Sequence, residues 1–123
     1  MLDIKEIAVN FLQDVASGKV IEAFEKYGSL EFKHHNVHYK GDLISLRNGM
    51  HISHQNFPNK KIEVKNIFID GDMVITHSHM KLAPHDVGFI LVHIFKMKNN
   101  KIIELWDMNQ AIPEDSPNQN GAF

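Results

Sequence analysis

The sequence predicts a single α+β domain in which N-terminal helices cover one face of a curved antiparallel sheet. This prediction rests on a change in the spacing of apolar residues along the chain. Apolar residues recur at helical spacing in the first half, and from about residue 61 the period becomes two, as in a strand. Short turns join the predicted strands, which makes consecutive strands antiparallel neighbours. Helices followed by such a meander are typical of the α+β class, with the helices gathered on one face.

Three helices are expected ahead of the meander. The first has Ile4, Ile7 and Phe11 on one side, and a glycine follows its end. Asp42 is a plausible N-cap of the third. The expected helices span residues 3–16, 20–28 and 42–57, and residues 29–41 between the last two are predicted to form a short strand or an extended arm.

Four strands are expected in the second half. Each segment alternates apolar and polar residues and ends at a turn rich in Gly, Asn, Asp or Pro. A turn-rich tail follows the last strand, and no linker or repeat interrupts residues 1–123, which are therefore expected to form one domain. The predicted strands are residues 61–70, 72–83, 87–98 and 101–112, with turns at 70–72, 83–86 and 98–101.

Composition excludes several classes of protein. The net charge is −2 with no long run of one sign, so neither a nucleic-acid nor a membrane-surface partner is expected. The absence of cysteine excludes disulfides, thiolate metal sites and a cysteine nucleophile. No segment has the 18 or so apolar residues of a membrane span, and the N-terminus lacks the apolar stretch of a signal peptide. A cytoplasmic location is therefore expected.

Nine histidines are the unusual feature, and several fall on the predicted strands. His77, His79, His93 and Asp107 all occupy odd-numbered positions, and side chains alternate between the faces of a strand. If the odd-numbered faces of the three strands coincide, these groups line one concave apolar surface. The sequence does not fix the register on which this depends, but we expect His77 and His79 on the pocket side.

The even-numbered faces are also apolar in places, at Ile90, Val92, Ile94 and Trp106. A sheet that is apolar on both faces has both faces covered. The helices provide one cover, and a second copy of the chain is the simplest other. The sequence therefore predicts a homodimer.

Three chemistries could use a group of histidines and a carboxylate. A histidine on a strand is more often a hydrogen-bonded structural residue, but each buried polar group needs a partner, and a cluster of them is costly in a core. A metal site is conceivable, because the rings of a His-x-His pair on a strand point the same way. A His–Asp pair in an apolar pocket can also move protons near neutral pH, or simply orient a ligand. We expect no metal.

Short motifs resemble one known family over nearly the whole chain. These are His34-His35-Asn36-Val37, Thr76-His77-Ser78-His79, His93-Ile94-Phe95-Lys96 with the run from Lys101 to Gln110 that follows it, and the tail from Asn118 to Phe123. The run from Lys101 to Gln110 contains Glu104, Trp106 and Asp107. In this order they resemble the SnoaL-like polyketide cyclase branch of the nuclear transport factor 2-like (NTF2-like) superfamily. The resemblance implies a cone-shaped α+β barrel, a pocket closed by the N-terminal helices, a homodimer, and chemistry mostly without metal or organic cofactor.

The resemblance also implies roles for residues. In the cyclases, a carboxylate at the position of Asp107 acts as acid and base on a carbon acid, and a pocket histidine assists. His93 stands where the family has an aspartate, which replaces an anion, so a carboxylate-pair mechanism of the epoxide-hydrolase kind is not expected. The family's proline after Asn36 is also replaced, by Val37. A superfamily name fixes architecture better than reaction.

The sequence therefore predicts a pocket for a small hydrophobic or cyclic molecule. The predicted activity is that of a cofactor-independent lyase or isomerase, similar to an aldol cyclase, that acts on a carbonyl compound. The alternative is a non-catalytic binding or interaction module of the same fold. The predicted catalytic residues are Asp107, His77 and His93, and the predicted ligand-binding residues are His35, Asn36, His79, Trp106 and Gln110.

Overall fold

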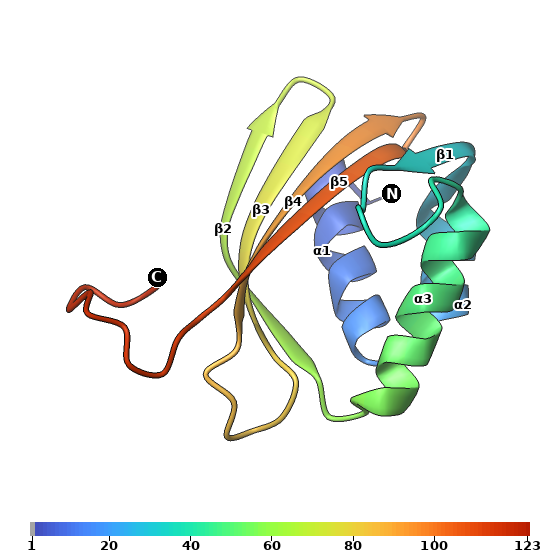
Figure 1. The fold of residues 1–123 in the computed structure, drawn as a ribbon. Coiled ribbons are helices and arrows are strands. Elements are labelled where there is room, and N and C mark those ends of the chain that lie inside the picture. The colour runs from blue at the N-terminus through green and yellow to red at the C-terminus, as the bar shows by residue number, and fades with distance from the viewer. Residues whose placement is uncertain (1) are drawn as a thin grey trace.

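A computed structural model describes residues 2–123 and has three helices and one five-stranded sheet (Figure 1). Every helix and strand expected from the sequence is present, with ends shifted by a few residues. The elements in chain order are α1 (Ile4–Ala16), α2 (Val20–Tyr27), β1 (Gly28–His34), α3 (Leu43–Asn56), β2 (Lys61–Asp70), β3 (Met73–Lys81), β4 (Phe89–Lys98) and β5 (Lys101–Ala111).

Two helices begin at aspartate caps. The Asp3 carboxylate accepts a hydrogen bond from the Glu6 amide, and the Glu6 side chain accepts one from the Asp3 amide, which forms a capping box at the start of α1. Asp42 accepts from the Ser45 amide at the start of α3, as the sequence predicts. These caps satisfy amides that no helical carbonyl can reach.

The sheet has the strand order β1-β5-β4-β3-β2. Strands β2 to β5 form the predicted antiparallel meander, but β1 runs parallel to β5, so the sheet is mixed rather than wholly antiparallel. A parallel neighbour requires a long connection, and here all the other strands and α3 lie between β1 and β5 in the chain.

The helices lie on one side of the sheet, and the C-terminal segment extends on the other (Figure 1). We call the side that faces the helices the inner face and the opposite side the outer face. Apolar residues of α1 and α2 pack on the inner face: the Phe11 ring lies 5.0 Å from Phe24 and 6.1 Å from Phe95, between ring centroids. Phe95 and Phe24 have almost no exposed surface, so this contact is the centre of the core.

The pairing of the strands decides which residues share a face. Between β4 and β5, His93 pairs with Asp107, so odd-numbered residues share a face. Between β3 and β4, His77 pairs with Val92 and Thr76 pairs with His93, so odd-numbered residues of β3 share a face with even-numbered residues of β4. The odd-numbered faces therefore do not coincide, and the expectation that His77 and His79 lie on the pocket side is wrong.

A β-bulge near the start of β5 changes the pairing within β4 and β5. Met97 pairs with Ile102, whereas Lys96 pairs with Glu104, which leaves Ile103 as the additional residue. Ile102 is fully buried and Ile103 is only half-buried. The bulge thus places Ile102 in the core and keeps Asp107, further along the strand, on the inner face.

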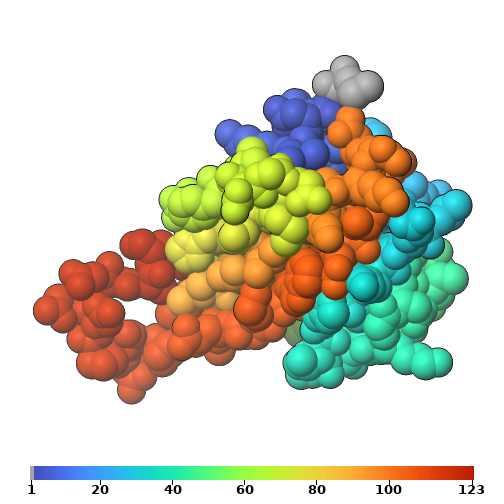
Figure 2. All heavy atoms as spheres, turned by 90° about the horizontal axis from the view of Figure 1, so that it is seen from above, coloured from blue at the N-terminus to red at the C-terminus, as the bar shows by residue number. Residues whose placement is uncertain are grey.

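The C-terminal segment leaves the end of β5 and projects away from the body of the molecule (Figures 1 and 2). It returns to the outer face at Phe123, whose ring centroid lies 5.3 Å from that of His77 and 4.7 Å from that of His79. Within residues 2–123, no helix is long and apolar enough to cross a membrane.

Candidate functional site

A cavity of about 80 Å³ lies between the helices and the inner face of the sheet. Most of its wall is apolar and comes from α1, α3 and the strands. This volume is below the roughly 300 Å³ at which sites for drug-sized ligands begin, so the cavity suits a small guest. The apolar lining includes Phe11, Leu12, Val15, Met50, Ile62, Leu91 and Leu105, and the polar lining is Lys60, His93 and Asp107.

Three polar side chains form a row across the inner face. Thr76 pairs with His93, and His93 pairs with Asp107, on neighbouring strands β3, β4 and β5. Side chains at directly paired positions on one face have Cβ atoms about 5 Å apart. The row therefore brings a hydroxyl, an imidazole and a carboxylate together on the inner face, and of these residues His93 and Asp107 line the cavity.

Asp107 is held by a residue from the loop after β1. The Asn36 Nδ2 donates a hydrogen bond of 2.9 Å to Asp107 Oδ2. The Asn36 Oδ1 accepts from the His38 amide at 2.9 Å, so the donating end of the Asn36 amide must be the end that faces Asp107. Asn36 thereby orients the Asp107 carboxylate.

The neighbouring His34 fixes this loop. Its Nδ1 accepts from the Asn36 amide at 3.1 Å, and its Nε2 lies 2.5 Å from the Lys40 carbonyl oxygen. These two contacts together require a proton on Nε2 and none on Nδ1. His34 is buried and is therefore a structural residue that positions Asn36.

His93 is held neutral by its surroundings. Burial lowers the pKa of its imidazole below the ordinary 6.5, and the negative charge of Asp107 opposes this effect without cancelling it. The ring retains some exposed surface along the cavity, but its Nδ1 is buried and has no hydrogen-bond partner among residues 2–123. The same holds for the Thr76 hydroxyl in the adjacent position. Two unpaired polar atoms in one row are unusual in a core whose only role is packing.

The other predicted site histidines lie on the outer face and are engaged there. His77 Nδ1 lies 3.1 Å from the side-chain Nδ2 of Asn66, and His79 Nε2 lies 2.8 Å from the Val87 carbonyl oxygen. Neither lines the cavity. Odd-numbered residues of β3 pair with even-numbered residues of β4, so the His77 and His79 side chains lie on the face of the sheet opposite to His93.

The remaining predicted ligand-binding residues also miss the cavity. His35 stacks on Trp106 with ring centroids 4.9 Å apart, and its Nε2 lies 2.6 Å from Glu104 Oε2. Gln110 lines a separate hollow beside the C-terminal segment. Of the eight residues that the sequence singled out, only Asp107 and His93 line the cavity, and Asn36 contacts Asp107.

The sequence patterns do not single out Thr76, which pairs with His93, or Lys60, which lines the cavity. Thr76 alternates with the histidines in Thr76-His77-Ser78-His79 and so lies on the opposite side of the strand from them. The length of the turn at 83–86 indicates which side that is. A turn with an even number of residues pairs odd-numbered positions with even-numbered ones, which would have placed Thr76 beside His93. Lys60 follows Pro58-Asn59 in a polar segment, and no pattern in the sequence indicates that it is buried.

Within the part of the chain that the structure describes, no three histidine, aspartate or glutamate side chains gather as a metal-binding group would. His93 and Asp107 are only two such residues, and His77 and His79 face away from them. The residues present therefore do not form a recognisable metal centre. The metal content of the protein stays a prediction.

Helices over one face of a mixed sheet, with a partly polar cavity between the two layers, define an α+β protein with an internal site. No protein-family model matches the chain, and a search of curated proteins found no significant match. Solved structures do match it over most of its length.

An NTF2-like protein of unknown function from Cytophaga hutchinsonii is 12% identical, with a TM-score of 0.71 over 89% of this chain and 92% of that one. A SnoaL-like polyketide cyclase from Agrobacterium tumefaciens is 14% identical, with a TM-score of 0.71 over 89% and 93% of the two chains. A putative polyketide cyclase from Acidithiobacillus ferrooxidans is 20% identical, with a TM-score of 0.68 over 86% and 87%.

The chain therefore has the fold that NTF2-like proteins share with SnoaL-like polyketide cyclases. This confirms the fold that the sequence resemblance implies. Identities this low establish the fold alone, and the reaction has to be argued from the site.

Proposed function

We propose that the protein is a cofactor-independent lyase or isomerase that moves a proton on a small carbonyl compound in the cavity, as an aldol-type cyclase does. One observation carries the proposal. A carboxylate oriented by Asn36 lies beside a neutral imidazole on the wall of an apolar cavity. General acid–base catalysis needs such a base at a fixed position, shielded from bulk water. Structural neighbours that bear the names of polyketide cyclases favour the same class.

The proposed chemistry uses two side chains. The Asp107 carboxylate accepts a proton from the carbon next to the carbonyl group, and the electron pair of that C–H bond forms the C=C bond of an enolate. The neutral His93 ring can donate an N–H hydrogen bond to the enolate oxygen. In a ring closure, the enolate carbon forms a bond to a second carbonyl carbon, and the proton on Asp107 passes to the resulting alkoxide.

A screen of small cyclic ketones, lactones and diketones tests the proposal, with Asp107→Asn as the key variant. The amide oxygen introduced by this substitution can still accept the hydrogen bond from Asn36, so the fold and ligand binding should be kept. We expect turnover to fall about 100-fold or more, the usual scale for loss of a general base. Equal turnover in the variant would remove Asp107 from the mechanism, and binding without turnover in the wild type would favour a binding module instead.

We also propose a homodimer through the outer face. Met108 and Phe68 on this face are 48% and 60% exposed, and Val92, Ile94 and Trp106 are only half-buried. An apolar face of this kind is typical of a subunit interface. Sedimentation equilibrium at micromolar concentration should give twice the mass of one chain, and a single 14.1 kDa species would contradict the proposal.

A further inference from the structure

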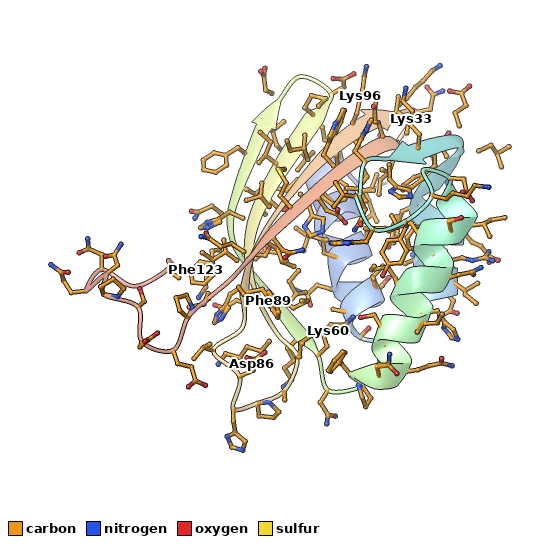
Figure 3. The ribbon with its side chains drawn as sticks, in the orientation of Figure 1. Lys33, Lys60, Asp86, Phe89, Lys96 and Phe123 are labelled. Carbon is orange, nitrogen blue, oxygen red and sulfur yellow. The ribbon has the colours of Figure 1, made fainter. Side chains whose placement is uncertain are left out.

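Lys60 is the one charged residue among the buried residues of the described chain, with 8% of its surface exposed. It lies in the short connection between α3 and β2, at the lower end of the space between the helices and the sheet (Figure 3). A lysine is almost never this buried unless an anion accompanies it. The burial of Lys60 therefore needs an explanation.

The amine of Lys60 has too few partners. Its Nζ donates one hydrogen bond, of 2.9 Å, to Ser53 Oγ. Among residues 2–123 no carboxylate forms an ion pair with it. An ammonium group has three donors, and burial lowers the pKa of this one because the charged form loses water. A cation that is buried with a single neutral partner destabilises the free protein.

The position of Lys60 links the cavity to the surface. It lines the cavity that contains His93 and Asp107, and it also lines a surface hollow of about 590 Å³. Ala16 and Ile62 border both spaces as well. Lys60 thus belongs to the boundary that the surface hollow shares with the cavity of His93 and Asp107, and it is the one charged residue of that shared boundary.

The two polar parts of the cavity carry opposite charges. The Asp107 carboxylate repels an anion, whereas the Lys60 ammonium attracts one. The remaining wall is mainly apolar and gives no other charged group for a ligand to contact. A guest with an apolar body and one negative group is therefore oriented, with the negative group at Lys60 and the body directed towards Asp107.

We propose that Lys60 is an anion-binding residue at the mouth of the cavity and that the ligand is a small carboxylate with an apolar body. This inference names a substrate class for the proposed acid–base site and rests on that proposal for the role of the inner end of the ligand. The carboxylate would occupy the donors that Ser53 leaves free. The apolar body would contact residues such as Leu12, Met50 and Leu91.

Binding of matched acids and amides tests the inference directly. Butyrate, cyclohexanecarboxylate and benzoate are each paired with their primary amide, which has a similar shape and no charge, and the affinities are measured by calorimetry at pH 7. We expect at least one acid to bind the wild type about tenfold more tightly than its amide, the scale of a hydrogen bond to a charged group. Equal affinities in every pair, or no binding by any acid, would overturn the inference.

Three variants assign the preference to Lys60. Lys60→Met should abolish it, Lys60→Arg should retain part of it, and Lys61→Met at the exposed neighbouring position should keep it in full. Lys60→Met should fold and should melt at a higher temperature than the wild type, because it removes a buried charge without a counter-ion. A preference that survives in Lys60→Met would overturn the inference.

The outcome is separable from that of the proposed catalysis. Asp107→Asn should bind the preferred acid at least as tightly as the wild type, because it loses a negative charge in the cavity. Acid binding without any turnover would contradict the proposed activity and leave the Lys60 site intact. Turnover of neutral carbonyl compounds without an acid preference would contradict the Lys60 site and leave the proposed activity intact.

Discussion

The two faces of the same three strands carry similar residue types and use them in opposite ways. On the inner face, Thr76, His93 and Asp107 form a row, and the last two line the cavity. Within the described chain, the Thr76 hydroxyl and His93 Nδ1 have no hydrogen-bond partner. On the outer face, His77 and His79 have hydrogen-bond partners and pack against Phe123. The difference indicates that the histidines which look most unusual in the sequence have structural partners, and it is the reason that we place the proposed chemistry on the inner face.

The polar groups of the two faces also differ in how deeply they are buried. The inner face buries its polar groups among aromatic and aliphatic side chains, where an imidazole is held neutral and a carboxylate is close. Within a single chain, the outer face leaves its polar groups near water, where hydrogen bonds and ion pairs contribute little. Chemistry that depends on a shifted protonation state is therefore expected on the inner face alone.

A pair of phenylalanines measures how unequal the two faces are. Phe95 on the inner face has 0% exposure, whereas Phe68 on the outer side of β2 is 60% exposed. We expect Phe95→Ala to lower the free energy of unfolding by about 3–5 kcal/mol, because it leaves a cavity at the centre of the core. Within a single chain, Phe68→Ala should cost about 1 kcal/mol or less. A further loss that grows with protein concentration is expected only from the proposed dimer. Urea denaturation of both variants checks this, and a similar loss in the two would mean that the outer face is as tightly packed as the core.

The protonation of His93 gives a second way to sharpen the contrast. Its folded-state pKa lies below the ordinary 6.5, so the unfolded chain binds the proton first as the pH falls. The folded state is favoured when His93 is neutral, so its contribution to the free energy of unfolding is fully present above about pH 6.5. This contribution is lost progressively as the pH falls towards the folded-state pKa. The unfolding free energy of the wild type relative to His93→Gln should therefore decrease between pH 7.5 and pH 5.

Thr76→Val serves as the control for this pH series, because it changes the same row without removing a titratable group. Its unfolding free energy should follow that of the wild type across the pH range. If the difference between wild type and His93→Gln stayed constant with pH, His93 would not be held neutral by the fold.

The outer histidines should matter least. His77→Ala combined with His79→Ala removes both rings, and we expect turnover of the preferred substrate to stay within about twofold of the wild type. The melting temperature should fall by only a few degrees, in line with the loss of half-exposed contacts. Steady-state kinetics and thermal melting check both statements. A tenfold loss of turnover in a folded double variant would place the chemistry on the outer face.

Much of the fold follows from the sequence because it depends on local patterns. The period of apolar residues identifies the helices and strands, and Asp42 marks the start of α3 as expected. The parallel pairing of β1 with β5 does not follow, since it joins segments that are far apart in the chain. Nothing local in residues 29–41 distinguishes a strand that pairs with β5 from one that pairs with a nearer neighbour.

The site is harder to predict because it depends on register. A shift by one residue moves every side chain of a strand to the other face. The even-numbered turn after β3 separates His77 from His93, whereas the bulge at Ile103 keeps His93 beside Asp107. The length of the turn is visible in the sequence and predicts the pairing of β3 with β4. The bulge is not visible there, because no residue in β5 is typical of a bulge. The burial of Lys60 depends on how α3 meets β2 and is likewise invisible in the sequence.

The central claim is that a small guest binds between the helices and the inner face, and xenon tests this without knowledge of the substrate. Xenon enters apolar cavities, and methyl NMR in xenon-saturated buffer reports which side chains it contacts. We predict shifts for the methyl groups of Leu12, Leu91 and Leu105, and none for Ile90, Val92 and Ile94 on the outer face. Shifts confined to the outer face, or no shift at all, would contradict the account.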